Sequence, residues 1–167
     1  MALQAFYQTV AQLCFTLLGL WWLVLQTKYS EWIGNPERRR MITNISLYFL
    51  LPGTMSLLAL LSPQAHYLWQ VAFVLAGGLG AFETAALIRD ERGHKVESWL
   101  ALVVRWVGVG LYIVICLVAL IALFPAVVKA TGIVPLTVAG VVLTLIVVSG
   151  VTLAWAYFIE PRPDTSG

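Results

Sequence analysis

The chain has 167 residues and a net charge of +2; 60% of the residues are hydrophobic and only 11% are charged. The mean hydropathy of +0.89 excludes an ordinary soluble domain, in which about 25% of residues carry charge. The small net charge gives no sign of nucleic-acid binding.

Five apolar stretches are each long enough to cross a hydrocarbon core of about 30 Å, and together they occupy most of the chain. We expect them at residues 4–26, 41–61, 66–88, 98–124 and 133–159. The sequence therefore predicts an all-α fold, a single bundle of five transmembrane helices over residues 1–167, embedded in the lipid bilayer as a multi-pass protein.

The first stretch carries polar side chains at four-residue intervals. They are Gln4, Gln8, Gln12 and Thr16, and they form a stripe that winds slowly around the helix. Because an amide is unfavourable against lipid, the stripe is expected to face protein or water. Two interpretations are open: hydrogen bonding within one protomer, or the lining of a pore around a symmetry axis. His66 and Gln70, near the start of the third stretch, are expected to complete an outer polar layer.

The basic residues are concentrated in the first and third loops. They include Lys28, Arg38, Arg39 and Arg40 in the first loop, and Arg89, Arg92 and Lys95 in the third. Short loops rich in lysine and arginine stay on the cytoplasmic side. The distribution predicts an N-terminus outside, a C-terminus in the cytoplasm, and a location in the plasma (inner) membrane.

In the second stretch, Pro52 is followed by Gly53 near mid-span. Proline removes one backbone hydrogen bond from a helix, so we expect a helix kink at this point. Such a break is either a structural feature of the span or the hinge or binding point of a transporter.

The third and fourth stretches each contain a charged residue inside the apolar run, Glu83 and Arg105. The two helices are antiparallel, so the charges are expected at similar depth. Pairing would offset the cost of each charge, up to about 2.5–3.5 kcal/mol at mid-span. Glu83 shares a helical face with Gly80, and Arg105 shares one with Gly108, so both faces allow close contact. The pattern predicts an ion pair between Glu83 and Arg105.

Other polar residues are expected at the same depth as this pair. They are Asn44 and Tyr48 in the second stretch and Thr152 in the fifth, and with Glu83 and Arg105 they make up a predicted inner polar cluster. The cluster has two interpretations. It is either a structural clasp that fixes the order of the helices, or a site where Glu83 exchanges a proton or contacts a permeating cation beside Arg105.

The sequence predicts no enzyme activity, no metal site and no cofactor. Cys14 and Cys116 do not form a CxxC pair, and the two histidines, His66 and His94, have no companions at the spacing of a zinc protease or a hydrolase. Both cysteines are therefore expected to be apolar packing residues.

The sequence favours a subunit of an oligomeric channel or transporter for an ion or small solute. Five spans leave little room for an enclosed path in one chain, so a homo-oligomer is expected. The alternative is a structural or assembly subunit that binds another membrane protein through glycine-rich faces. These faces would hold Gly77, Gly78 and Gly80 in the third stretch, or Gly108 and Gly110 in the fourth.

Overall fold

The computed structural model describes residues 2–32, 36–61, 67–91, 99–132 and 134–159. These residues form six helices and no strand, so the predicted all-α class is confirmed for the described part of the chain. The helices are α1 (Ala2–Trp32), α2 (Pro36–Leu60), α3 (Leu68–Glu91), α4 (Trp99–Ala122), α5 (Pro125–Thr131) and α6 (Pro135–Ile159).

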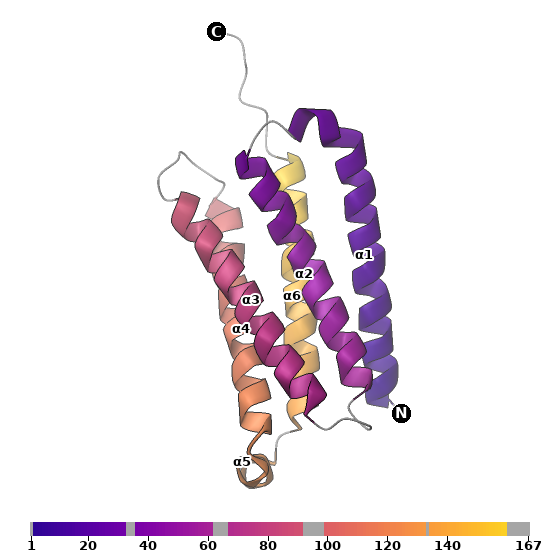
Figure 1. Ribbon diagram of the computed structural model, residues 1–167, viewed down its shortest axis with the longest axis vertical. Helices are drawn as coiled ribbons and strands as arrows, with labels where there is room; N and C mark the ends of the chain where they lie inside the picture. The colour runs from indigo at the N-terminus through magenta and orange to yellow at the C-terminus, as the bar shows by residue number, and fades with distance from the viewer. Residues whose placement is uncertain (1, 33–35, 62–66, 92–98, 133, 160–167) are drawn as a thin grey trace.

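Five of the helices are long and run side by side, and α1 begins at the end of the bundle opposite to the one where α6 finishes (Figure 1). Each contains an apolar segment of 21 to 26 residues, which is enough to cross a membrane. The segments are Ala2–Thr27, Arg39–Leu60, Leu68–Arg89, Leu102–Ala122 and Pro135–Ala156, close to the predicted stretches. The bundle is compatible with a multi-pass integral membrane protein.

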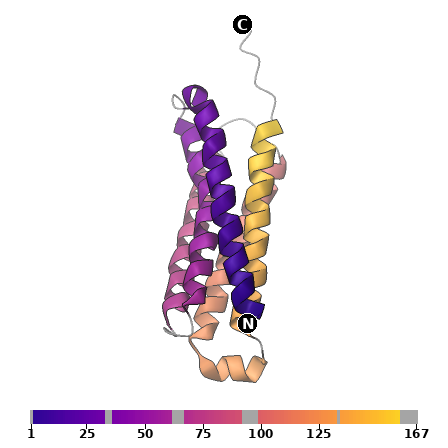
Figure 2. The ribbon, with the colours of Figure 1, turned by 90° about the vertical axis from the view of Figure 1, so that its right-hand side faces the viewer.

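Two connections differ from the prediction. α1 continues to Trp32 and α2 begins at Pro36. Both helices therefore include residues that the sequence predicts as part of the first loop. Proline suits the first position of a helix because its missing N–H would have no partner there. The predicted fourth loop contains α5, which lies across the end of the bundle in Figure 2. Pro125 begins this helix, and Gly132 ends it with a φ of 64°, a left-handed conformation that favours glycine.

Two tyrosine side chains of the core lie against glycines of neighbouring helices. Tyr112 of α4 is buried, and a Cβ added to Gly80 of α3 would lie 2.5 Å from its ring. Tyr48 of α2 lies against Gly108 of α4 and Gly150 of α6 in the same way. The two rings pack edge to face with centroids 5.7 Å apart. Four helices therefore meet at these two side chains.

α2 passes through Pro52 without interruption. The adjacent Gly53 packs on α1, where an added Cβ would lie 3.1 Å from the Cβ of Cys14. The Thr54 hydroxyl, two residues after Pro52, is shared between the carbonyl oxygens of Leu50 and Leu51 at 3.0 and 2.9 Å. The Pro52–Gly53 step therefore brings α1 and α2 together, and the kink itself stays a prediction.

α1 is an edge helix of the bundle. Its buried side packs along α2, and near its start the Tyr7 hydroxyl donates a hydrogen bond to the carbonyl oxygen of Leu136 in α6 at 2.6 Å. The opposite side of α1 faces away from the bundle (Figure 2). Polar side chains on that side therefore face away from the other helices, and a hydroxyl there can bond within α1 itself, as Thr16 does to the carbonyl oxygen of Gln12.

We expect Gly80→Ala to lower the free energy of unfolding by about 1–3 kcal/mol, because the new methyl group would overlap the buried Tyr112 ring. Gly78→Ala is the matched control on the same helix, since nothing lies within 4 Å of a Cβ at Gly78. Unfolding of both variants in the same detergent would be followed by circular dichroism. Equal stability of the two variants would show that the Gly80 contact is not tight.

Candidate functional site

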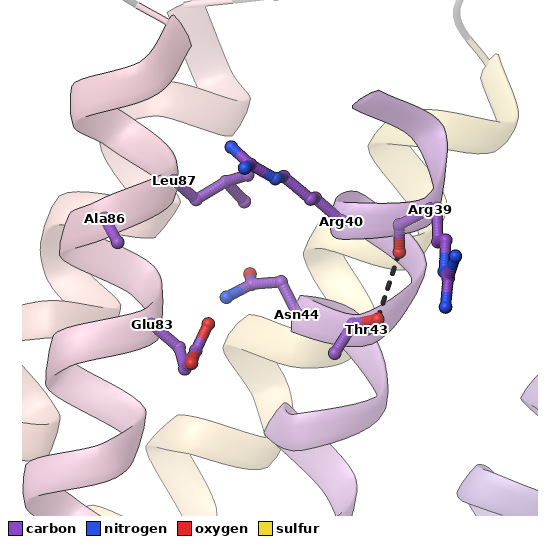
Figure 3. A pocket seen from close by; sticks show the side chains of 7 residues that line it. All are labelled: Arg39, Arg40, Thr43, Asn44, Glu83, Ala86 and Leu87. Carbon is purple, nitrogen blue, oxygen red and sulfur yellow. Dashed lines mark hydrogen bonds between the residues drawn. The ribbon is translucent and has the colours of Figure 1, made fainter. Parts of the chain in front are cut away.

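A polar cleft lies between α2 and α3, at the end of the bundle where α2 begins and α3 finishes (Figure 3). Its volume is about 490 Å³. The lining residues are Arg39, Arg40, Thr43 and Asn44 from α2, and Glu83, Ala86 and Leu87 from α3. Residues three or four apart share one face of a helix, so each helix presents a continuous wall to the cleft.

The charged side chains of the cleft come from opposite walls. Figure 3 shows the Glu83 side chain pointing from α3 toward α2, and the Arg40 side chain crossing from α2 toward Leu87 of α3. Arg39 lies farther from Glu83, at the rim. The cleft therefore has a basic wall on α2 and a carboxylate on α3.

The inner end of the cleft is held by a buried hydrogen bond. Asn44 is 5% exposed and Thr84 is 1% exposed, and the Asn44 Nδ2 donates to the Thr84 Oγ1 at 3.3 Å. Thr43, on the same turn of α2, instead donates to the carbonyl oxygen of Arg39 in its own helix at 3.0 Å. Asn44 thus links α2 to α3.

Thr84 and Tyr112 are absent from the predicted inner polar cluster, although both are buried in the polar part of the core. Thr84 follows Glu83 directly, and its polar side chain within an apolar stretch could have indicated that it belongs to the cluster. Tyr112 shares the face of α4 that carries Arg105 and Gly108, seven and four residues earlier. Either could have been included on helical periodicity.

Two predicted members of the inner polar cluster lie deep in the bundle. Tyr48 is fully buried and Arg105 is 1% exposed, which makes Arg105 the largest fully buried side chain in the described part of the chain. Arg105 and Thr84 are polar neighbours of the Tyr48 hydroxyl, which lies directly against Gly108. The structure therefore brings Asn44, Tyr48 and Arg105 into one buried region.

Glu83 lines the cleft, and its side chain is directed from α3 to α2 (Figure 3). It is half-buried and directly precedes Thr84, which lies in the buried region. The helix packs on α4 at Gly77, where an added Cβ would lie 2.7 Å from the Cys116 sulfur, and at Gly80. The ion pair between Glu83 and Arg105 stays a prediction.

Thr152, the remaining member of the predicted cluster, uses its hydroxyl within its own helix. It donates to the carbonyl oxygen of Val148 at 2.9 Å. The contact of α6 with this region is made two residues earlier, where Gly150 lies against the Cβ of Tyr48. α6 therefore contributes close packing to the site, and the structure gives no interaction between Thr152 and the other predicted residues.

The predicted outer stripe lies on the exposed side of α1. Gln4, Gln8, Gln12 and Thr16 are all exposed. Thr16 donates to the carbonyl oxygen of Gln12 at 2.8 Å, but no hydrogen bond reaches the three glutamine amides among the described residues. Hydrogen bonding of these amides within one protomer, one of the two interpretations, is therefore not observed.

Gln70 does not join this stripe. It is 6% exposed, and its Nε2 donates to the carbonyl oxygen of Ala122 at 3.1 Å. Ala122 is the last residue of α4, and the carbonyls of the last helical turn lack partners within the helix. Gln70 therefore caps α4 from α3. His66, the other residue assigned to the outer layer, lies outside the described residues.

The thiols are packing groups, as their positions in the sequence predict. Cys14 is buried, and the Cys116 Sγ donates to the carbonyl oxygen of Val74 at 3.4 Å. Within the described ranges, no group of three or more histidine, cysteine, aspartate or glutamate residues gathers as a metal site would require. Comparison with protein-family models, curated proteins and solved structures found no match to this chain.

The Asn44–Thr84 hydrogen bond is testable by a double-mutant cycle. We expect Asn44→Leu and Thr84→Val each to destabilise the folded protein, with a coupling energy of about 0.5–1 kcal/mol, as is usual for hydrogen bonds between membrane helices. The matched control is the cycle of Asn44→Leu with Thr43→Val, because the Thr43 hydroxyl bonds within its own helix. Additive effects in both cycles would contradict the assignment.

Proposed function

We propose that this protein is a subunit of a homo-oligomeric channel or transporter that moves an ion or a small polar solute across a lipid bilayer. The observation that carries this proposal is the exposed stripe on α1. Gln4, Gln8 and Gln12 lie within the apolar segment Ala2–Thr27 and point away from their own bundle.

An amide on the outer side of a membrane helix needs a partner. Burial in hydrocarbon without a hydrogen bond costs about 4–8 kcal/mol for an amide on the least polar scale, so lipid is a poor environment for three of them. A glutamine amide both donates and accepts. The stripe can therefore bond to the same stripe of a second copy across a symmetry axis, or to water along that axis.

The solute path is proposed between protomers rather than through one. The interior of the bundle is filled by side chains with no more than 1% exposure, among them Tyr48, Met55, Phe73 and Tyr112. α1, by contrast, lies at the edge, where several copies can arrange their polar stripes around a shared axis. The cleft of Figure 3 would then lie near one mouth of the assembly.

The orientation is part of the proposal, with the N-terminus outside and the C-terminus in the cytoplasm of a plasma (inner) membrane. Arg39, Arg40 and Arg89 all lie at the end of the bundle where α2 begins and α3 finishes. A single end that collects arginines is what the positive-inside rule favours for the cytoplasmic surface.

A structural or assembly subunit is the second candidate function. Gly77, Gly80 and Gly108 are occupied by contacts within the protomer, so they are not part of a surface for a partner. Gly78 and Gly110 have nothing within 4 Å of an added Cβ, which leaves two open positions where another membrane helix could approach closely. Such a subunit would use these positions, or the α1 stripe, without moving a solute.

Cysteine cross-linking tests the assembly. In a Cys14→Ala, Cys116→Ala background, we expect Gln8→Cys to give a disulfide-linked dimer in membranes upon mild oxidation, because copies meet along α1. Val141→Cys is the matched control, since Val141 is 58% exposed on α6 and lies outside the stripe. A monomer at Gln8→Cys, or equal cross-linking at both positions, would contradict a homo-oligomer centred on α1.

Reconstitution tests transport. We expect folded protein in liposomes to carry ions or small polar solutes above the rate of empty vesicles, and Gln8→Leu to lower that rate at least about tenfold by removing a polar group from the path. Leu13→Ala, at another exposed position of α1, is the control and should keep the rate. Cross-linking at Gln8 without any flux would favour the structural subunit.

A further inference from the structure

We propose that the cleft between α2 and α3 binds a phosphoethanolamine group, a zwitterion with one phosphate and one primary ammonium. The cleft offers opposite charges on opposite walls, arginine on α2 and Glu83 on α3 (Figure 3). This inference does not depend on the proposed transport activity or on the oligomer.

The basic wall suits the phosphate. Arg40 crosses the cleft toward α3, and Arg39 stands at the rim. A guanidinium presents several N–H donors in one plane and binds phosphate oxygens through paired, charge-assisted hydrogen bonds. A phosphate between α2 and the cleft mouth would therefore meet one arginine directly and a second within the same turn of the helix.

The acidic wall suits the ammonium. The Glu83 carboxylate accepts hydrogen bonds and carries the charge opposite to an ammonium. Asn44 lies near it on the α2 wall, and its Nδ2 donates to Thr84. A primary ammonium has three N–H donors for the carboxylate oxygens, whereas the quaternary ammonium of a choline group has none. The carboxylate therefore selects ethanolamine over choline.

The position and size of the cleft suit a lipid headgroup. The apolar segment of α2 begins at Arg39 and that of α3 ends at Arg89, so the cleft lies at the level where hydrocarbon gives way to headgroups. Its volume of about 490 Å³ falls in the range of small-molecule sites. Ala86 and Leu87 supply an apolar wall beside which an acyl chain could leave the site. Free phosphoethanolamine presents the same groups without the chains.

The first test uses the unmodified protein in detergent micelles, with binding of single lipids measured by native mass spectrometry. Phosphatidylethanolamine, phosphatidylcholine and phosphatidylglycerol with identical acyl chains are compared. We expect phosphatidylethanolamine to bind at least tenfold more tightly than either of the others. Equal or tighter binding of phosphatidylglycerol would overturn the proposal, because it would show that the arginines act without Glu83.

Competition on the same protein identifies the source of the group. Displacement of the lipid by free O-phosphoethanolamine at millimolar concentration, but not by ethanolamine or inorganic phosphate, indicates a soluble zwitterion as ligand. Binding of the lipid that free O-phosphoethanolamine does not displace indicates the lipid headgroup. If inorganic phosphate displaced the lipid as effectively as O-phosphoethanolamine does, the result would contradict a site that binds both the phosphate and the ammonium.

Variants then test the separate roles of the two walls of the cleft. We expect Glu83→Gln to reduce phosphatidylethanolamine affinity about tenfold while phosphatidylglycerol affinity is kept or raised, and Arg40→Gln to reduce both about tenfold. Arg89→Gln is the matched control, since Arg89 is exposed at the same end of α3 and does not line the cleft. Unchanged lipid selectivity in folded Glu83→Gln would overturn the role of the carboxylate. If that variant does not fold, the lipid comparison and the competition on the unmodified protein still decide the proposal.

Discussion

The contacts of two tyrosine side chains with glycines bring four of the five long helices together. Tyr48 lies against Gly108 and Gly150, and Tyr112 lies against Gly80, so that α2, α3, α4 and α6 approach one another at adjacent points. In a bundle this apolar, hydrophobic exclusion gives little preference among helix pairs, and close van der Waals contact selects the arrangement. A side chain larger than glycine at these points would separate the helices and open the core.

The buried polar groups depend on this packing. Asn44 of α2 reaches Thr84 of α3, and the contact of Tyr48 with Gly108 of α4 places Tyr48 beside Arg105. A buried arginine carries a large desolvation cost that only nearby polar groups and fixed geometry can offset. The bundle thus keeps its one fully buried arginine, among the residues the structure describes, in the region where Tyr48 packs against Gly108.

Two polar surfaces are left to meet other molecules. The cleft between α2 and α3 opens at one end of the bundle, and the glutamine stripe of α1 faces outward along its length. The first combines both signs of charge, which suits a small zwitterion at the level of the headgroups. The glutamine stripe is uncharged, and its amides both donate and accept hydrogen bonds, which suits contact with a second copy of the same helix or with water. Their chemistry differs, so the proposals for them are independent.

The sequence alone determined the all-α class and the five long apolar helices, because helix length and apolar composition are local properties set by the thickness of a bilayer. It also predicted Asn44, Tyr48 and Arg105 at one depth, since depth follows from counting 1.5 Å per residue, and the structure brings these three residues into one buried region. Only the tertiary structure decided which way each helix is rotated. α3 has glycines at 77, 78 and 80, and the sequence cannot tell which of them faces α4. Packing placed Gly77 and Gly80 against α4, because glycine lets two helices come close, and Glu83 then lines the cleft between α2 and α3.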